Sequence, residues 1–196
     1  MVERKALRQQ LRAARRALDA HEHARRSADI CRQLVNHHRF RAAQHIACYL
    51  PNDGEVDLLA LMDATWAMGK TLYLPVLSHI HHNRLYFLPY APGELLMTNR
   101  FGIPEPVLRS RRTPVVAKLD LVLAPLVGFD AQGNRLGMGG GFYDRTFAYL
   151  RRRHHWRKPH LLGVAFELQY CVSGLASEPW DVPLEGVVTE AGVRMF

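Results

Sequence analysis

The hydrophobic pattern of residues 45–74 most narrowly limits the fold of this chain. A short apolar run at residues 45–50 ends at a Pro-Asn-Asp-Gly turn, and a second run follows at residues 71–74. The segment between them has apolar residues at helical spacing, with Asp57 available to cap its start and Gly69 its end. A strand, a helix and a second strand in this order predict a right-handed parallel crossover.

The rest of the chain continues this alternation. The predicted helices are residues 2–18, 22–38 and 142–154, and the further predicted strands are residues 84–88, 120–124, 161–166 and 186–189. After Asp120, the second of these four strands is apolar at every position, as expected of a strand buried on both faces. Residues 91–118 predict an irregular connection with one short element at residues 94–97. The pattern predicts an α/β fold, a three-layer α/β/α domain with a mostly parallel open sheet that spans residues 1–196.

Composition excludes several other classes of protein. With 48% hydrophobic and 22% charged residues, the chain has enough apolar material for a packed core, which excludes a disordered chain. The longest apolar run, residues 121–129, is nine residues long, whereas a membrane-spanning helix needs about 20. The charged N-terminus lacks a secretory signal, and three cysteines without CxxC spacing are typical of a reduced, cytoplasmic protein.

Positive charge is concentrated near the N-terminus. The net charge is +8, and residues 1–41 carry eleven Lys and Arg against four acidic residues, with a smaller basic cluster at residues 151–158. An anionic small molecule or a nucleic acid can bind such a surface. The predicted helices in residues 1–41 lack interspersed aromatic side chains, and no RNA- or DNA-binding signature is present, which argues against nucleic acid.

Residues 125–145 are the strongest candidate for a binding site. They follow a buried strand and lead into a helix, and open α/β sheets bind ligands at this edge. Five glycines occur within residues 133–141, so several backbone N–H groups can point at one anion, with Arg135 beside them. Asp144 fits a divalent cation that accompanies phosphate. The alternative is a flexible loop with an aspartate that caps the helix.

Two standard nucleotide-binding motifs are absent. Residues 64–71 end in Gly-Lys-Thr as a P-loop does, but Ala64 replaces the first glycine and the segment runs from helix into strand. Residues 137–144 do not match GxGxxG, because Phe142 stands at the last glycine position. Any nucleotide is therefore bound by a different kind of loop.

Several motifs in register resemble one known family. They are Leu7-Arg8 in a basic helix, residues 49–55, Leu74-Pro75, residues 101–106, Pro125-x-x-x-Phe129-Asp130, the glycine motif at residues 133–144, residues 165–169, Asp181 and residues 187–189. Over nearly the whole chain they resemble the 5-formyltetrahydrofolate cyclo-ligase family. The resemblance implies a fold like that of the NagB/RpiA/CoA transferase group. It also implies ATP-dependent conversion of 5-formyltetrahydrofolate to 5,10-methenyltetrahydrofolate with Mg²⁺, releasing ADP and phosphate.

The resemblance further implies roles for individual residues. The implied ATP-binding residues are Arg4, Lys5, Arg8, Arg135, Leu136, Gly137, Met138, Gly139, Gly140, Gly141, Phe142 and Tyr143. Arg4 and Lys5 are alternatives for one contact, and Met138 and Gly140 stand where relatives often carry basic residues. Phosphate binding would thus depend on backbone N–H groups and on Arg135.

Catalysis, folate binding and metal binding are assigned in the same way. The resemblance implies that Arg135 and Tyr143 are catalytic, that Glu55 and Tyr143 bind folate, and that Asp144 and Asp181 hold Mg²⁺. Gln169 lies in a matching block without an assigned role. The expected partners are small molecules only, with neither nucleic acid nor membrane, and the expected state is a monomer.

Two other functions stay open at this point. An enzyme with the same ATP site and a different acceptor, another formamide or a carboxylate, is favoured if Glu55 lies far from Gly139. A nucleic-acid-binding protein is favoured if RNA affinity falls steeply with salt and ATP does not bind.

Other conspicuous residues have simpler interpretations. His79, His81 and His82 lie in a predicted turn without an acidic or cysteine partner, so no metal site is predicted there. The remaining predictions are structural: Leu58, Met62 and Trp66 as core, Trp180 as packing, Asp53 as a turn former and Asp57 as a helix cap.

Overall fold

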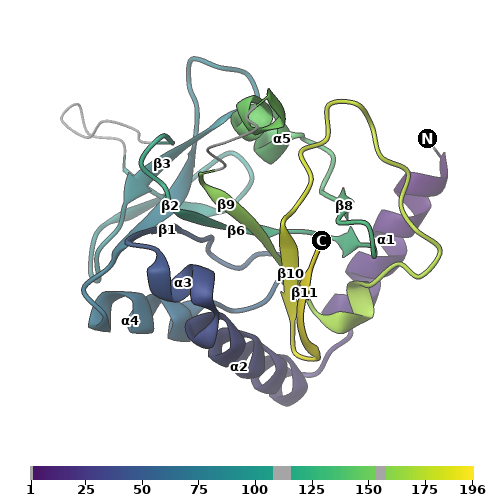
Figure 1. Cartoon of the computed structure of the whole chain (residues 1–196), viewed down its shortest axis with the longest axis horizontal. Helices are drawn as coiled ribbons and strands as arrows, with labels where there is room; N and C mark the ends of the chain where they lie inside the picture. Colours follow the sequence, from purple (N-terminus) through teal and green to yellow (C-terminus); the bar gives the residue numbers. More distant parts are fainter. Residues whose placement is uncertain (1, 108–115, 153–157) are drawn as a thin grey trace.

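A seven-stranded sheet forms the centre of the molecule in the computed structural model, which describes residues 2–107, 116–152 and 158–196 (Figure 1). The strand order is β11-β10-β9-β6-β1-β2-β3. These strands are β1 (His45–Ala47), β2 (Thr71–Leu77), β3 (Leu85–Pro89), β6 (Leu121–Pro125), β9 (His160–Val164), β10 (Gly186–Thr189) and β11 (Gly192–Met195). The five central strands are parallel, and the edge strands β3 and β11 are antiparallel to their neighbours. The prediction of a mostly parallel sheet is confirmed.

The strand order of the sheet reverses between β1 and β6, although both strands run in the same direction. From β1 it proceeds to β2 and β3 on one side, and from β6 it proceeds to β9 and β10 on the other. β1 and β6 are direct neighbours, with Ile46 opposite Leu121. The loops that leave their carboxyl ends diverge there, and open α/β sheets bind ligands at such a point.

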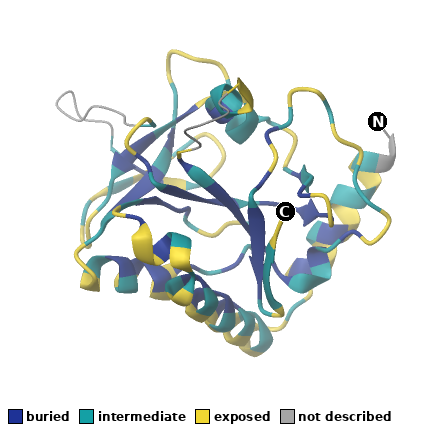
Figure 2. Cartoon of the chain, viewed as in Figure 1, coloured by how far each residue is buried: buried dark blue, intermediate teal, exposed yellow. Residues whose placement is uncertain are grey.

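Helices cover both faces of the sheet. α2 (Ala20–Asn36), α3 (His38–Ala42) and α4 (Leu59–Ala67) lie on one face, and α5 (Phe142–Phe147) with the 3₁₀ helix η1 (Ala148–Arg152) lies on the other (Figure 1). Ile30, Leu34 and Phe40 are fully buried in the first core, and Phe147 is fully buried in the second. Figure 2 shows buried residues along the strands and exposed residues on the outer surfaces of the helices. The three-layer prediction is confirmed.

α1 (Val2–Arg16) lies apart from both helical layers, at one end of the sheet (Figure 1). Its Leu11 packs with Val127, Leu136 and Cys171, which belong to the segments that follow β6 and the 3₁₀ helix η2 (Glu167–Gln169). A Cβ on Gly128 would lie 2.7 Å from the Leu11 side chain, so this contact requires glycine. α1 is thus packed on the loops at the carboxyl edge of the sheet.

Several predicted boundaries are wrong by a few residues. β1 ends at Ala47, three residues before the end of the predicted strand, and α2 ends at Asn36 because His37 is extended. α4 begins beyond Leu58, and Asp57 accepts a hydrogen bond from Leu59 N at 2.9 Å. α5 gives way to η1 after Phe147, and the predicted helix end at residue 154 lies outside the described residues.

Sequence periodicity does not reveal the shortest strands. β4 (Leu96–Thr98) and β5 (Pro104–Pro106) pair in the predicted irregular connection, whose residues 108–115 lie outside the described part. β7 (Gly128–Phe129) and β8 (Arg135–Leu136) pair within the glycine-rich segment. Strands of two or three residues are too short to show an alternation. The described chain holds no helix with the length and apolar character needed to cross a bilayer.

Candidate active site at the carboxyl edge of the sheet

The glycine loop presents backbone N–H groups that have no partner among the described residues. Gly139 and Gly141 have positive φ angles of 101° and 63°, which reverse the chain within a few residues. Two carbonyl oxygens of the loop accept hydrogen bonds from other segments: Arg8 Nε donates to Gly137 O at 2.7 Å, and Asn83 Nδ2 donates to Gly140 O at 3.0 Å. Within the described chain, no N–H group from Gly137 to Gly141 donates a hydrogen bond. Such a row of free donors suits an anion.

Arg135 lies beside this loop and is held in place. Its Nη1 donates to Val182 O at 2.6 Å, and its Nη2 pairs with Asp144 Oδ1. Burial lowers the pKa of the Arg135 guanidinium, and the charges of Asp144 and Asp181 act in the opposite direction. A buried cation between two carboxylates is fixed before any ligand arrives.

Asp144 pairs with this arginine, and the charge of Asp181 acts on it as well. Asp144 Oδ1 accepts a hydrogen bond from Val182 N at 3.0 Å, so α5 and the segment before β10 are joined here. Asp181 Oδ2 accepts from Glu178 N at 3.0 Å. The described residues contain no group of three or more His, Cys, Asp or Glu side chains able to hold a metal ion. Two carboxylates are a fitting set only for a cation that takes its other ligands from phosphate and water.

α1 directs two of its basic residues at the site. Arg8 contacts the glycine loop, and burial lowers the pKa of its guanidinium. Arg4 lies 3.8 Å from Asp181 and 3.5 Å from Glu178, measured between charged atoms. Lys5 is exposed on another side of the helix. The geometry therefore brings Arg4 and Arg8 to the site and leaves Lys5 outside it.

Glu55 lies in the loop after β1, among buried groups. Its side chain is 13% exposed, and its Oε2 accepts from Asn52 N at 3.2 Å. Burial raises the pKa of Glu55 to about 7, although the charge of Arg15 acts to lower it. Burial also raises the pKa of the Tyr143 hydroxyl, on which the charges of both Glu55 and Arg135 act. Tyr143 directly follows the glycine loop and is near enough to Glu55 for their charges to interact, so the two predicted subsites are neighbours.

Tyr49 carries a polar atom that the described structure does not satisfy. Its hydroxyl is buried and makes no hydrogen bond to any described residue. Burial raises the pKa of this hydroxyl, and the neighbouring Glu55 and Tyr143 act in the same direction. Tyr49, Glu55 and Tyr143 therefore form one cluster of groups whose charges influence one another.

Gln169 has a structural position. Its Nε2 donates to Leu126 O at 2.8 Å and to Val127 O at 3.0 Å, and its Oε1 accepts from Phe166 N at 2.9 Å. All these partners are backbone atoms, so the amide ties the ends of β6 and β9 together.

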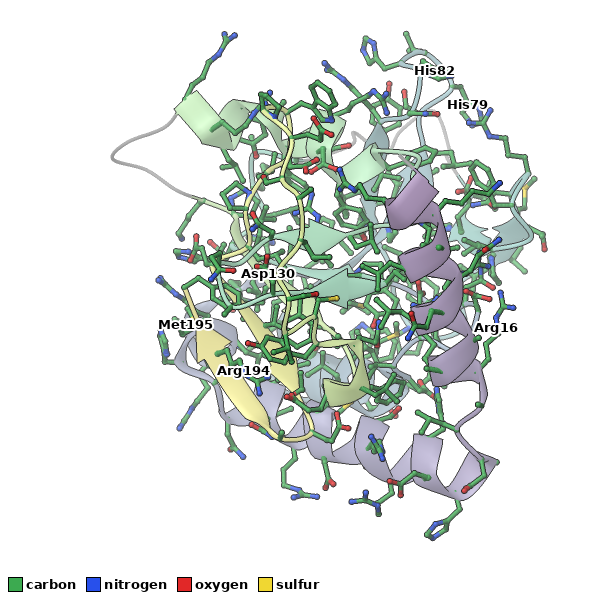
Figure 3. The ribbon with its side chains drawn as sticks, turned by 90° about the vertical axis from the view of Figure 1, so that its right-hand side faces the viewer. Arg16, His79, His82, Asp130, Arg194 and Met195 are labelled. Atoms are coloured by element: carbon green, nitrogen blue, oxygen red, sulfur yellow. The ribbon has the colours of Figure 1, made fainter. Side chains whose placement is uncertain are left out.

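Other conspicuous residues lie away from the site or at its surface. His79 and His82 lie on the outer turn between β2 and β3 (Figure 3), without any metal-binding group among the described residues. Leu58 and Met62 are buried core residues, as predicted. Trp180 is 61% exposed, so the prediction that it is a packing residue is wrong.

An arginine cluster around Asp53 is a feature of the site that was not predicted from the sequence. Arg12 Nε and Arg15 Nη2 donate to Asp53 Oδ2 at 2.7 and 2.8 Å, and Arg16 pairs with Oδ1. Figure 3 shows α1 along this side of the molecule, with Arg16 near its end. Burial acts to raise the pKa of Asp53, but these hydrogen bonds lower it to about 2. Asp53 is therefore an anchor for α1 as well as the predicted turn former.

One sequence signal pointed to this cluster. Arg15 falls on the apolar stripe of α1, four residues after Leu11 and three before Leu18. A charged residue in such a position is buried only with a partner.

Comparisons with known proteins all give the same family. The model of the 5-formyltetrahydrofolate cyclo-ligase family matches residues 1–190. The 5-formyltetrahydrofolate cyclo-ligase of Haemophilus influenzae is 38% identical, covering 92% of this chain and 94% of its own length, and that of Escherichia coli is 39% identical, covering 93% and 98%. The solved structure of the 5,10-methenyltetrahydrofolate synthetase of Aquifex aeolicus superposes with a TM-score of 0.80 at 32% identity, over 98% of this chain and 92% of that one.

Proposed function

This chain belongs to the 5-formyltetrahydrofolate cyclo-ligase family, and we propose that the glycine loop, Arg135, Glu55 and Tyr143 form its active site. The reaction is the closure of 5-formyltetrahydrofolate to 5,10-methenyltetrahydrofolate. The proposal assigns the two substrates to the two loops that diverge at the β1–β6 point, with ATP on the glycine loop and folate on the Glu55 loop.

The glycine loop binds the ATP phosphates. The row of N–H groups from Gly137 to Gly141, which have no partner among the described residues, supports this assignment more than any other observation. Arg135 adds a full positive charge that balances the charge on the transferred phosphoryl group. Arg8 and Arg4 hold the loop and the Asp181 segment from the side of α1.

Asp144 and Asp181 would hold Mg²⁺ in this proposal. When bound, the ion would offset the negative charge of the phosphates. Asp144 is already paired with Arg135, so the arginine and the carboxylate are positioned together for the phosphates.

Glu55 recognises the aminopyrimidine edge of the folate. An ionised carboxylate accepts two parallel hydrogen bonds from such an edge, one from the amino group and one from the ring N–H. Its position in a loop held by Asp53 and α1 fixes the direction of both bonds. Tyr143, which directly follows the glycine loop and is near Glu55, contacts the reacting end of the folate.

The chemistry then proceeds in two stages. The formyl oxygen attacks the γ-phosphorus of ATP, the bond from that phosphorus to the bridging oxygen breaks, and ADP leaves. N10 attacks the activated formyl carbon and loses its proton, and the carbon–oxygen bond breaks to release phosphate. The protein mainly aligns the reactants and balances charge.

The test mixes purified protein, ATP with magnesium and 5-formyltetrahydrofolate, and follows the methenyl product by its absorbance. We expect product in proportion to ATP consumed. A Glu55→Ala variant is expected to raise the KM for folate at least tenfold more than the KM for ATP. A folded, ATP-binding protein that makes no product would exclude this reaction, and equal effects of Glu55→Ala on both substrates would exclude the assignment of Glu55.

The proposal extends to a cytoplasmic protein that acts as a monomer. The three cysteines are buried and free of disulfides, which suits a reducing compartment. Sedimentation of the purified protein at assay concentration tests the monomer, which predicts a mass close to 22.4 kDa.

A further inference from the structure

Arg15 joins the two loops of the active site through one buried guanidinium. Its side chain is 0% exposed; Nε donates to Asp53 O at 2.8 Å, and Nη1 donates to Leu126 O at 3.1 Å. Asp53 belongs to the loop after β1, and Leu126 directly follows β6. Its Nη2, which bonds Asp53 Oδ2 at 2.8 Å, lies 3.7 Å from Glu55 Oε1.

We propose that Arg15 is a positioning residue for the ring-closure reaction, one that fixes the Glu55 carboxylate and favours its ionised form for the folate. This inference rests on the proposed function, in which Glu55 binds the aminopyrimidine edge. Only the ionised carboxylate accepts hydrogen bonds at both oxygens, because a protonated one carries a hydrogen of its own. The charge state of Glu55 therefore decides how tightly the folate binds.

Asp53 does not need Arg15 for its own charge. Arg12 and Arg16 both pair with the Asp53 carboxylate as well. Three arginines face one aspartate, which leaves positive charge available to the neighbouring Glu55. A buried guanidinium is costly unless it is paired and fully hydrogen-bonded, and all three nitrogens of Arg15 have a partner.

Other groups around Glu55 do not replace this charge. The charged or titratable groups that face Glu55 are Arg12 and Arg15 of α1, Asp53 of its own loop, Tyr49 after β1, Tyr143 of α5 and His23 of α2, which contacts its backbone oxygen at 3.0 Å. The pKa values of both tyrosines are raised, so their hydroxyls are neutral near pH 7. Asp53 raises the pKa of Glu55, and Arg15 is the strongest influence that lowers it.

The test is the pH dependence of 5-formyltetrahydrofolate binding without ATP, measured by calorimetry from pH 5.5 to 9. Affinity for the wild-type protein is expected to rise with pH and to level off once Glu55 is ionised. Arg15→Gln is expected to move the midpoint upward by about one pH unit, which weakens binding about fivefold at pH 7. Arg15→Lys, which keeps the charge, is expected to restore most of the midpoint shift.

Asp53→Asn gives a shift of opposite sign. Removing a negative neighbour lowers the pKa of Glu55, so the midpoint is expected to move to lower pH. Asn tolerates the left-handed backbone of residue 53, where φ is 57°. This variant keeps the inference testable if Arg15→Gln does not fold, and an unmoved midpoint would contradict it.

Arg16→Gln is the matched control. Arg16 is the next residue of α1 and pairs with the same aspartate, but its side chain is 51% exposed and makes no contact with Glu55. The midpoint of the pH dependence of folate binding by Arg16→Gln is expected to equal that of the wild-type protein. If Arg15→Gln weakens binding equally at every pH with an unmoved midpoint, Arg15 has only a structural role and the inference is wrong.

Glu55→Gln separates failure of this inference from failure of the proposed function. If folate binding by Glu55→Gln keeps the wild-type affinity and pH dependence, Glu55 does not bind the folate, and the active-site assignment fails. If Glu55→Gln binds weakly and without pH dependence while Arg15→Gln keeps the wild-type midpoint, only the role of Arg15 is refuted.

Discussion

Two loops diverge at the centre of the sheet, and they differ in whether their polar groups have hydrogen-bond partners. In the loop after β1, Asp53 is bound by three arginines of α1. In the glycine loop after β6, the carbonyls are held, but the N–H groups from Gly137 to Gly141 have no partner within the described chain. The Asp53 carboxylate of the first loop is satisfied without ligand, whereas the N–H groups of the second loop have hydrogen bonds still to make. In this comparison the satisfied carboxylate fixes the site, and the unsatisfied N–H groups are available to bind.

The largest effect is expected from the charges beside the glycine loop. Arg135→Ala and Asp144→Asn are each expected to lower kcat/KM about a thousandfold, because they remove charge balance where phosphoryl transfer occurs. Steady-state turnover measures the loss, with circular dichroism as a check on folding. Arg32→Ala, which removes an exposed arginine on α2, is the control for loss of charge. Near-normal turnover by both variants would mean that the phosphates bind elsewhere.

A methyl group in the glycine loop is expected to have the next largest effect. Residue 139 has a φ of 101°, which an alanine adopts only under strain. Gly139→Ala is expected to raise the KM for ATP about tenfold with little change in the KM for folate. Gly137 has no positive φ and no atom within 4 Å of an added Cβ, so Gly137→Ala is expected to have a smaller effect. Equal effects of the two substitutions would refute the backbone explanation.

The stability of the Glu55 loop is expected to depend on pH. The pKa of Glu55 is about 7 in the folded protein, against an ordinary value of 4.5. Between these values the unfolded chain has released its proton and the folded chain has not, so stability falls as pH rises and levels off above pH 7. Glu55→Gln has no titrating carboxyl group at this position, so it does not lose stability in this way as pH rises. Urea unfolding at pH 5 and pH 8 is expected to show the variant gaining on the order of 2 kcal/mol over the wild-type protein. A constant difference would contradict the raised pKa.

The smallest effect is expected at the unsatisfied hydroxyl of Tyr49. Removing a buried donor that has no partner costs little, so Tyr49→Phe is expected to change the free energy of unfolding by less than about 1 kcal/mol, towards greater stability. Tyr73→Phe is the matched comparison, because the Tyr73 hydroxyl lies 3.1 Å from His45 Nδ1. That variant is expected to lose about 1 kcal/mol in the same denaturant titration. A comparable loss in Tyr49→Phe would show that its hydroxyl is bonded in solution.

The sequence predicts the central architecture because hydrophobic period is a local property. The change of period at His45 and the apolar residues after Asp120 locate β1 and β6, the two strands that define the site. The hairpin of β7 and β8 escapes prediction, because two-residue strands have no period and are set by Asp130, which bonds the backbone N–H of Gln132 and Asn134.

Prediction of the site is limited by contacts between distant residues. The glycine loop and Arg135 could be predicted because the residues that indicate phosphate binding lie within nine consecutive positions of the sequence. The choice between Arg4 and Lys5 depends on how α1 is rotated, and the role of Asp53 depends on a partner 38 residues away. Such pairings follow from tertiary packing, which cannot be seen in a single sequence. The position of Arg15 on an apolar stripe is the local sign that it has a distant partner.

The order of α1 and its partners along the chain has a consequence for folding during synthesis. The helix precedes the residues that it contacts, which include Asp53, Gly137 and Asp181. Arg8 can make its hydrogen bond only after Gly137, 129 positions later, has been added to the chain. A growing chain therefore completes the contacts of this basic helix in steps, first with Asp53 and later with the glycine loop and the Asp181 segment.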